Sequence, residues 1–150
     1  MLPLALNPAS EPYRDAVVSE LRQWVGRDFS PGNPAQCMNF VRYILGQIGV
    51  PLATAITTRP RDGHETFPAI ASSLAGEDLG TWIASPGDTR AGDIMFFRDT
   101  YHTGYPPNTI THVGIAVDLA GFIHRPTSAR PVERSNVAGF WADTWYGALR

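Results

Sequence analysis

The chain has 150 residues and a formal net charge of −2, and 43% of its residues are hydrophobic. This length suits a single domain over residues 1–150 whose core needs no disulfide, and the one cysteine could form none within the chain. There is no basic stripe, and no apolar segment approaches the ~20 residues of a membrane span, so neither nucleic acid nor membrane is an expected partner.

Helical periodicity marks the first half of the chain. Residues 11–25 are expected to form an amphipathic helix, whose apolar face comprises Val17, Leu21 and Trp24. A second helix is expected to begin close to Cys37, after a candidate cap at Asn33. Cys37 shares the buried side of this helix with Val41, Ile44 and Ile48. A third, shorter helix is expected over about residues 67–75.

The second half of the chain is rich in short β-type segments that are separated by turn residues. These segments are 92–99, 111–118, 121–126 and 129–135. Asp118 and Gly121 lie between the second and third segments, which predicts a hairpin. Helices followed by strands predict an α+β domain with a mostly antiparallel sheet, in which residues 99–110 form a surface loop.

Cys37 is either a small buried hydrophobe or a nucleophile. The first turn of a helix has unpaired N–H groups and a dipole that favour the thiolate, so this position is suited to a thiol of lowered pKa. Such a thiolate reacts with alkylating agents without needing alkaline pH. A nucleophile also needs a base within reach and a group that orients that base.

Four histidines are available as the base, and two of them lie in the predicted hairpin. His112 begins the strand "HVGIAV" and His124 ends the strand "GFIH", so pairing of these strands brings both imidazoles to one edge of the sheet. His112 could then accept the cysteine proton while His124 fixes its tautomer. His64 and His102 lie in loops and are interpreted as structural. The histidines lack the close spacing of metal ligands, so no metal is expected.

The order of these motifs resembles the NlpC-type cell-wall peptidases, which are papain-like cysteine peptidases. The matching elements are the helix-initial Cys37, "AGDIMFF" (91–97), "HVGIAV" (112–117) and "FIHRP" (122–126). The resemblance spans about residues 24–135. It implies a papain-like α+β fold with Cys37 as nucleophile, His112 as base and His124 as orienting residue. The pair Gly92-Asp93 matches the strand motif of the family and is interpreted as structural.

The residues beside the cysteine depart from the family pattern. The family usually has Asp-Cys-Ser-Gly-Phe, whereas this chain has "QCMNF" (36–40), and Phe29 stands where a tyrosine is common. The Gln36-Cys37 pair is instead similar to the CHAP amidases. These departures, which include Met38 and Asn39, affect the expected choice of substrate but keep the nucleophile and the base.

The resemblance implies hydrolysis of amide bonds in peptidoglycan stem peptides, typically the bond between D-glutamate and a diamino acid, and it implies no cofactor. Two alternatives stay open: a CHAP-like amidase that cuts another cell-wall bond, and an inactive module that binds wall peptides. The first ten residues lack the basic region of a secretory signal, so an extracellular or periplasmic location would need another delivery route. The sequence does not indicate an oligomeric state.

Overall fold

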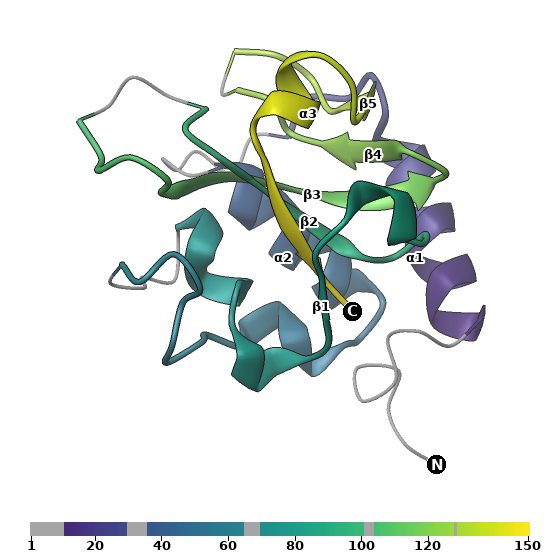
Figure 1. Ribbon diagram of the computed structural model, residues 1–150. Helices are drawn as coiled ribbons and strands as arrows, with labels where there is room; N and C mark the ends of the chain where they lie inside the picture. Colours follow the sequence, from purple (N-terminus) through teal and green to yellow (C-terminus); the bar gives the residue numbers. More distant parts are fainter. Residues whose placement is uncertain (1–10, 30–35, 65–69, 101–103, 128) are drawn as a thin grey trace.

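A computed structural model describes residues 11–29, 36–64, 70–100, 104–127 and 129–150. Six strands form one antiparallel sheet in the order β1-β6-β2-β3-β4-β5 (Figure 1). The strands are β1 Trp82–Ile83, β2 Ile94–Arg98, β3 Ile110–Asp118, β4 Gly121–His124, β5 Glu133–Asn136 and β6 Trp145–Leu149. The prediction of an α+β domain with a mostly antiparallel sheet is confirmed.

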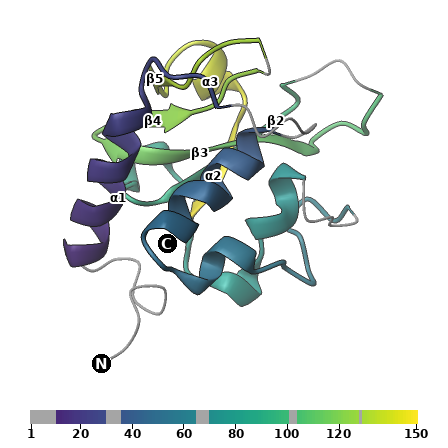
Figure 2. The same ribbon diagram turned by 180° about the vertical axis from the view of Figure 1, so that it is seen from behind.

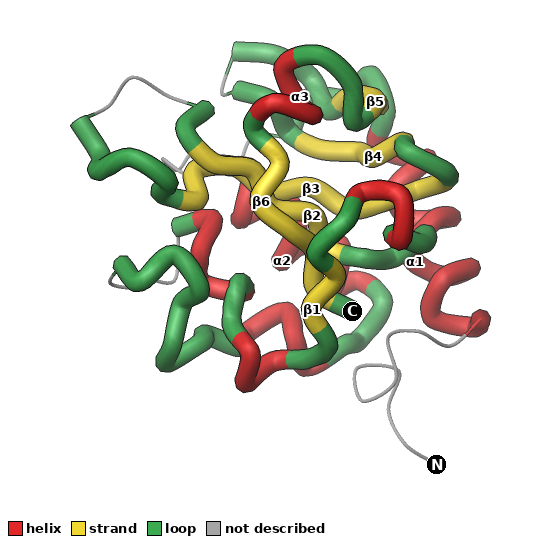
Figure 3. The backbone as a smooth tube through the Cα atoms, in the orientation of Figure 1, coloured by secondary structure: helices red, strands yellow, loops and turns green. Residues whose placement is uncertain are grey.

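The two long helices, α1 (Glu11–Trp24) and α2 (Gln36–Gln47), lie on the same side of this sheet (Figure 2). A short helix, α3 (Phe140–Asp143), leads into β6 near β4 and β5 (Figure 3). In the described part of the chain, 3₁₀ helices connect the other elements: η2 Pro51–Thr54, η3 Ala71–Leu74, η4 Glu77–Leu79 and η5 Pro86–Asp88. None of the described helices is long and apolar enough to cross a membrane.

The two faces of the sheet bury separate apolar clusters, because successive side chains of a strand point to opposite faces. On β2, Ile94 and Phe96 belong to the main core, which the two long helices cover. Met95 and Phe97 belong to a smaller cluster on the opposite face, which is covered by Trp141 and Trp145. The sheet is therefore protected on both faces, and the second face carries the histidines described below.

The Gly92-Asp93 pair ties three elements together. Gly92 has a φ of +95°, and a Cβ there would lie only 2.6 Å from the Tyr13 ring, whose hydroxyl donates to the Gly92 carbonyl at 3.0 Å. The buried Asp93 carboxylate accepts two hydrogen bonds from Arg150, at 2.7 and 3.0 Å, and one from the backbone of Arg90. These contacts join β2 to α1 and to the segment that follows β6, as expected for a structural motif.

Several predicted elements have different bounds in the structure. The helix expected over residues 67–75 is represented by η3, and Phe67 and Pro68 lie outside the described residues. Here the carbonyls of Ser73 and Ala75 accept hydrogen bonds from Thr57 and Arg61, so they pair with a separate segment and do not extend a helix. The strand expected over 129–135 begins only at Glu133, and the sequence did not indicate β1, β6 or α3.

Candidate active site

Cys37 is the second residue of α2, and its side chain is buried, with 6% of the residue exposed. The helix cap expected at Asn33 lies outside the described residues. The sulfur accepts hydrogen bonds from the backbone amides of Cys37, Met38 and Val113. Val113 follows His112 directly on β3, so the start of α2 lies against the beginning of that strand.

Burial raises the pKa of the Cys37 thiol to about 11. The three backbone amides lower this pKa, as the sequence predicts for the first turn of a helix, but desolvation of the thiolate is the larger effect. The expectation of a lowered thiol pKa is therefore wrong for the free protein. At neutral pH, the buried sulfur is a neutral thiol that must lose its proton before it can attack.

The hairpin brings His112 and His124 into direct contact. β3 and β4 pair through Ile115 with Ile123 and Ala116 with Phe122, which places both imidazoles on the same face of the sheet. The Nε2 atom of His112 lies 2.7 Å from the Nδ1 atom of His124. The predicted juxtaposition of these two histidines is thus present in the structure.

Gly114 makes room for this pair. A Cβ at this position would lie 3.0 Å from the Cβ of His124 and 2.8 Å from the ring of Phe122. A larger residue would therefore push the His124 ring or its neighbour away. The glycine of "HVGIAV" has this packing role between the two histidines.

The far side of His124 contacts two residues of β5 that the sequence did not single out. The Nε2 atom of His124 lies 2.9 Å from the hydroxyl of Ser135 and 3.9 Å from a carboxylate oxygen of Glu133. The other carboxylate oxygen of Glu133 is 2.7 Å from Arg130. Only the two-residue spacing of Glu133 and Ser135 on a predicted strand could have suggested that both face His124.

Aromatic rings enclose the histidine pair. Trp141 lies 5.0 Å from the centroids of both imidazole rings, and Phe122 lies 4.4 Å from that of His124. This burial lowers the pKa of His112 and of His124, and the neighbouring His112 and Arg130 lower that of His124 further. Both imidazoles are therefore neutral at pH 7, and a neutral imidazole is the form that can accept a proton.

The Nδ1 atom of His112 is buried and has no hydrogen-bond partner among the described residues. The structure thus holds the thiol against the backbone beside His112 without a hydrogen bond between the sulfur and this nitrogen. A pocket of about 520 Å³ opens onto His112 and is also lined by Arg130, Glu133 and Ser135. The site combines a buried thiol, a ring nitrogen of His112 without a partner among the described residues, and an adjoining cavity.

The other two histidines are not part of this cluster. His64 lies in a turn where its backbone amide donates to Asp62, and His102 lies outside the described residues. No group of three His, Cys, Asp or Glu side chains that could hold a metal occurs in the part of the chain that the structure describes. In the loop expected over residues 99–110, Tyr105 is exposed and Tyr101 lies outside the described residues.

Comparison of the sequence with known families identifies the family of this chain. A family model described as the NlpC/P60 family matches residues 23–150. The chain belongs to the NlpC/P60 family. No curated protein sequence matches it.

Solved NlpC/P60 structures share the fold of this chain. An NLP/P60 family protein similar to a lipoprotein, from Staphylococcus aureus, has a TM-score of 0.63 at 20% identity, and the match covers 94% of this chain and 42% of that one. The NlpC/p60 domain of the peptidoglycan hydrolase SagA has a TM-score of 0.59 at 22% identity, over 91% and 97% of the two chains. NlpC2 from Trichomonas vaginalis has a TM-score of 0.60 at 17% identity, over 91% and 45%. This chain therefore spans less than half the length of two of the three relatives.

Proposed function

We propose that this NlpC/P60 protein is a cysteine peptidase or amidase that hydrolyses amide bonds in bacterial peptidoglycan stem peptides. Cys37 is the nucleophile, His112 the general base and His124 the residue that orients it. Family membership and the likeness to a peptidoglycan hydrolase domain support the reaction and the substrate class. The observation that carries the proposal is that Nδ1 of His112 is buried and has no hydrogen-bond partner among the described residues. The backbone amide of the next residue, Val113, donates to the thiol sulfur.

The base role fixes where the protons of the histidine pair must be. To accept the thiol proton at Nδ1, His112 must carry its own hydrogen on Nε2 and donate it to Nδ1 of His124, 2.7 Å away. His124 then carries its hydrogen on Nε2 and donates it to the Ser135 hydroxyl at 2.9 Å. The Glu133 carboxylate, 3.9 Å from the same nitrogen, favours this arrangement because it can only accept.

The reaction follows the usual two steps of a cysteine peptidase. The thiol proton moves to Nδ1 of His112 as the sulfur attacks the amide carbonyl, and the backbone amide of Cys37 donates to the oxyanion. His112 then protonates the leaving amine, and an acyl-enzyme forms. A water molecule that loses its proton to His112 releases the carboxylic acid and restores the thiol.

The test of the function is digestion of purified peptidoglycan, with mass spectrometry of the soluble products. We expect fragments that end in a newly formed carboxylate and a newly formed amine within the stem peptide. Fragments cut at another cell-wall amide would identify the CHAP-like alternative. An intact polymer that nevertheless retains the protein would identify a binding module, the alternative that the burial of Cys37 favours.

Ser135 gives a prediction about orientation of the base. Ser135→Ala removes the acceptor for the His124 N–H, and we expect kcat to fall about tenfold, the rate equivalent of one hydrogen bond of ~1.4 kcal/mol, with little change in KM. Ser135→Thr keeps the hydroxyl and should restore most of the rate, and Ser19→Ala on the exposed face of α1 is the control. Nitrogen NMR of the histidine side chains should show the Nε2–H tautomer at His112. Equal losses in the alanine and threonine variants would indicate that Ser135 only fills space.

The raised pKa of Cys37 predicts how its alkylation depends on pH. Because this pKa is about 11, the thiolate is a minor form below pH 10, and its fraction rises tenfold for each pH unit. We expect the rate of iodoacetamide labelling to rise about tenfold per unit between pH 7 and pH 9. The urea-unfolded chain is the control, and its rate should level off near the ordinary thiol pKa of ~8.5. A folded protein that labels equally fast at pH 6 and pH 9 would instead contain a thiolate paired with a charged His112.

A further inference from the structure

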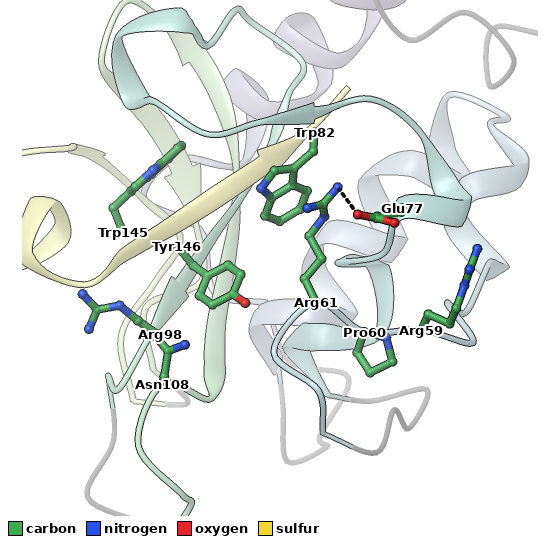
Figure 4. Close-up of a pocket in the computed structure, with 9 residues that line it drawn as sticks. All are labelled: Arg59, Pro60, Arg61, Glu77, Trp82, Arg98, Asn108, Trp145 and Tyr146. Carbon is green, nitrogen blue, oxygen red and sulfur yellow. Dashed lines mark ion pairs between the residues drawn. The ribbon is translucent and has the colours of Figure 1, made fainter.

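A second cavity, of about 590 Å³, is lined by the residues labelled in Figure 4, which include Arg98 of β2 and Tyr146 of β6. Its walls come from the segment 59–61, from β1, and from the adjacent ends of β2 and β6. Three arginines and three aromatic residues line it: Arg59, Arg61, Arg98, Trp82, Trp145 and Tyr146. Glu77 is the one acidic residue of the lining, so the walls carry two more positive than negative charges.

Arg61 is held flat at the centre of this cavity. Its guanidinium lies 4.2 Å from the centre of the Trp82 ring. That ring also stacks nearly parallel on Phe96, with 5.7 Å between centroids, and meets the Tyr146 ring edge-on at 6.1 Å. Figure 4 shows the Tyr146 hydroxyl pointing toward the Arg61 side chain. A guanidinium that packing has already ordered loses little further entropy when it binds a ligand.

The N–H donors of Arg61 have few strong partners in the free protein. Its Nε atom is buried and has no hydrogen-bond partner among the described residues. Its acidic neighbour Glu77 lies 3.6 Å away, and the Glu77 side chain is 68% exposed, so water competes strongly for this ion pair. A buried donor without a partner is costly, and a carboxylate or phosphate would satisfy it with a charge-assisted bond.

We propose that this cavity binds a sugar that carries a carboxylate or phosphate group. The anion pairs with Arg61, while Arg59 raises the local positive potential; Arg98 is already paired with Asp99 at 3.1 Å. Both faces of Trp82 are in contact with other groups, so this indole is not available to sandwich an aromatic ligand. Tyr146, Trp145 and the amide of Asn108 leave a mixed wall of ring surfaces and polar groups that suits a hydroxylated ring.

The cavity lies close enough to His112 to hold part of one extended substrate. Phe97 of β2 pairs with His112 on one side and with Trp145 on the other. Two spacings of ~4.8 Å between neighbouring strands put the backbones of residues 112 and 145 about 10 Å apart. This placement rests on the proposed function, since it assigns the anionic sugar to the same cell-wall polymer, as a phosphorylated sugar or as a muramic acid whose carboxylate carries no stem peptide. Binding itself does not depend on catalysis.

The test is calorimetric binding to the Cys37→Ala protein, which cannot turn over its ligand. The probes are N-acetylmuramic acid, N-acetylglucosamine 1-phosphate and neutral N-acetylglucosamine. We expect at least one anionic sugar to bind at least tenfold more tightly than the neutral one and to weaken as salt rises. Tighter binding of the first or of the second probe identifies a carboxylate or a phosphate as the preferred group.

Arg61→Gln in the same background should weaken binding of the anionic sugar at least tenfold. Arg22→Gln changes the charge equally at an exposed position of α1 and should leave it unchanged. Arg61→Lys keeps the positive charge but lacks the planar guanidinium that stacks on Trp82, so it should give an intermediate affinity. Thermal melting of each variant shows that it is folded.

Equal affinities for the three sugars, no binding by any, or equal binding by the two glutamine variants would overturn the proposal. Hydrolysis is not measured in this test, so its failure would leave the proposed reaction intact.

Discussion

Cys37→Ala is expected to abolish peptidoglycan hydrolysis while the protein stays folded. The sulfur is the only atom that forms the covalent bond to the substrate in the proposed reaction, so no other described group can replace it. Alanine is a good helix former, and Cys37 occupies the first turn of α2, so the backbone there has no reason to change. The loss of one buried sulfur should cost only about 1 kcal/mol of stability, as other small core truncations do.

The measurement is the release of soluble muropeptides from purified peptidoglycan by wild type and variant at equal concentration. Circular dichroism and thermal melting establish that the variant is folded. Cys37→Ser is a second variant, which keeps a hydroxyl in place of the thiol and should be almost as inactive, because a serine hydroxyl is a far weaker nucleophile at this pH. Activity above a few per cent in Cys37→Ala would remove Cys37 from the mechanism.

His112→Ala is expected to lower kcat by about 10²–10⁴, the usual range for loss of a general base. The effect should be large because the thiol pKa is raised to about 11, so little thiolate forms unless a neighbouring group takes the proton. His64→Ala is the matched control, since it removes the same kind of side chain from a turn outside the cluster. A comparable loss at His64 would contradict the assignment of the base.

The orienting role of His124 can be separated from packing by two variants. His124→Asn can still accept a hydrogen bond from Nε2 of His112, whereas His124→Leu cannot, so the asparagine variant should retain much more activity. Both variants change the volume enclosed by Phe122 and Trp141, so a packing role would reduce activity equally in the two. The ratio of their kcat values therefore reports the hydrogen bond.

The sequence was sufficient to predict the parts of the site that depend on local pattern. Strand periodicity and the turn at Asp118 and Gly121 brought His112 and His124 together, because a hairpin fixes the register of its two strands. Helical spacing placed Cys37 at the start of α2. The assignment of nucleophile and base stays a prediction, since the structure contains no hydrogen bond between Cys37 and His112.

What the sequence could not predict depends on long-range packing. Ser135 and Glu133 face His124 only because β5 pairs with β4, and Arg61 reaches Trp82 across 21 positions of the chain. The raised pKa of Cys37 has the same origin, because burial depends on every element that covers the thiol. A motif such as "QCMNF" contains none of this information.

The position of β6 in the sheet has a consequence for how the chain folds. This strand is the last of the six along the chain, yet it lies between β1 and β2, with partners such as Trp82 and Leu149 far apart in sequence. Such pairings require large loops to close first, so the sheet should assemble on the slower, millisecond-to-second side of the range for small domains. Until residues 145–149 are in place, β1 and β2 each expose an unpaired edge. In that interval the nascent chain is open to edge-to-edge aggregation, and a chaperone that shields those edges would raise the yield of native protein.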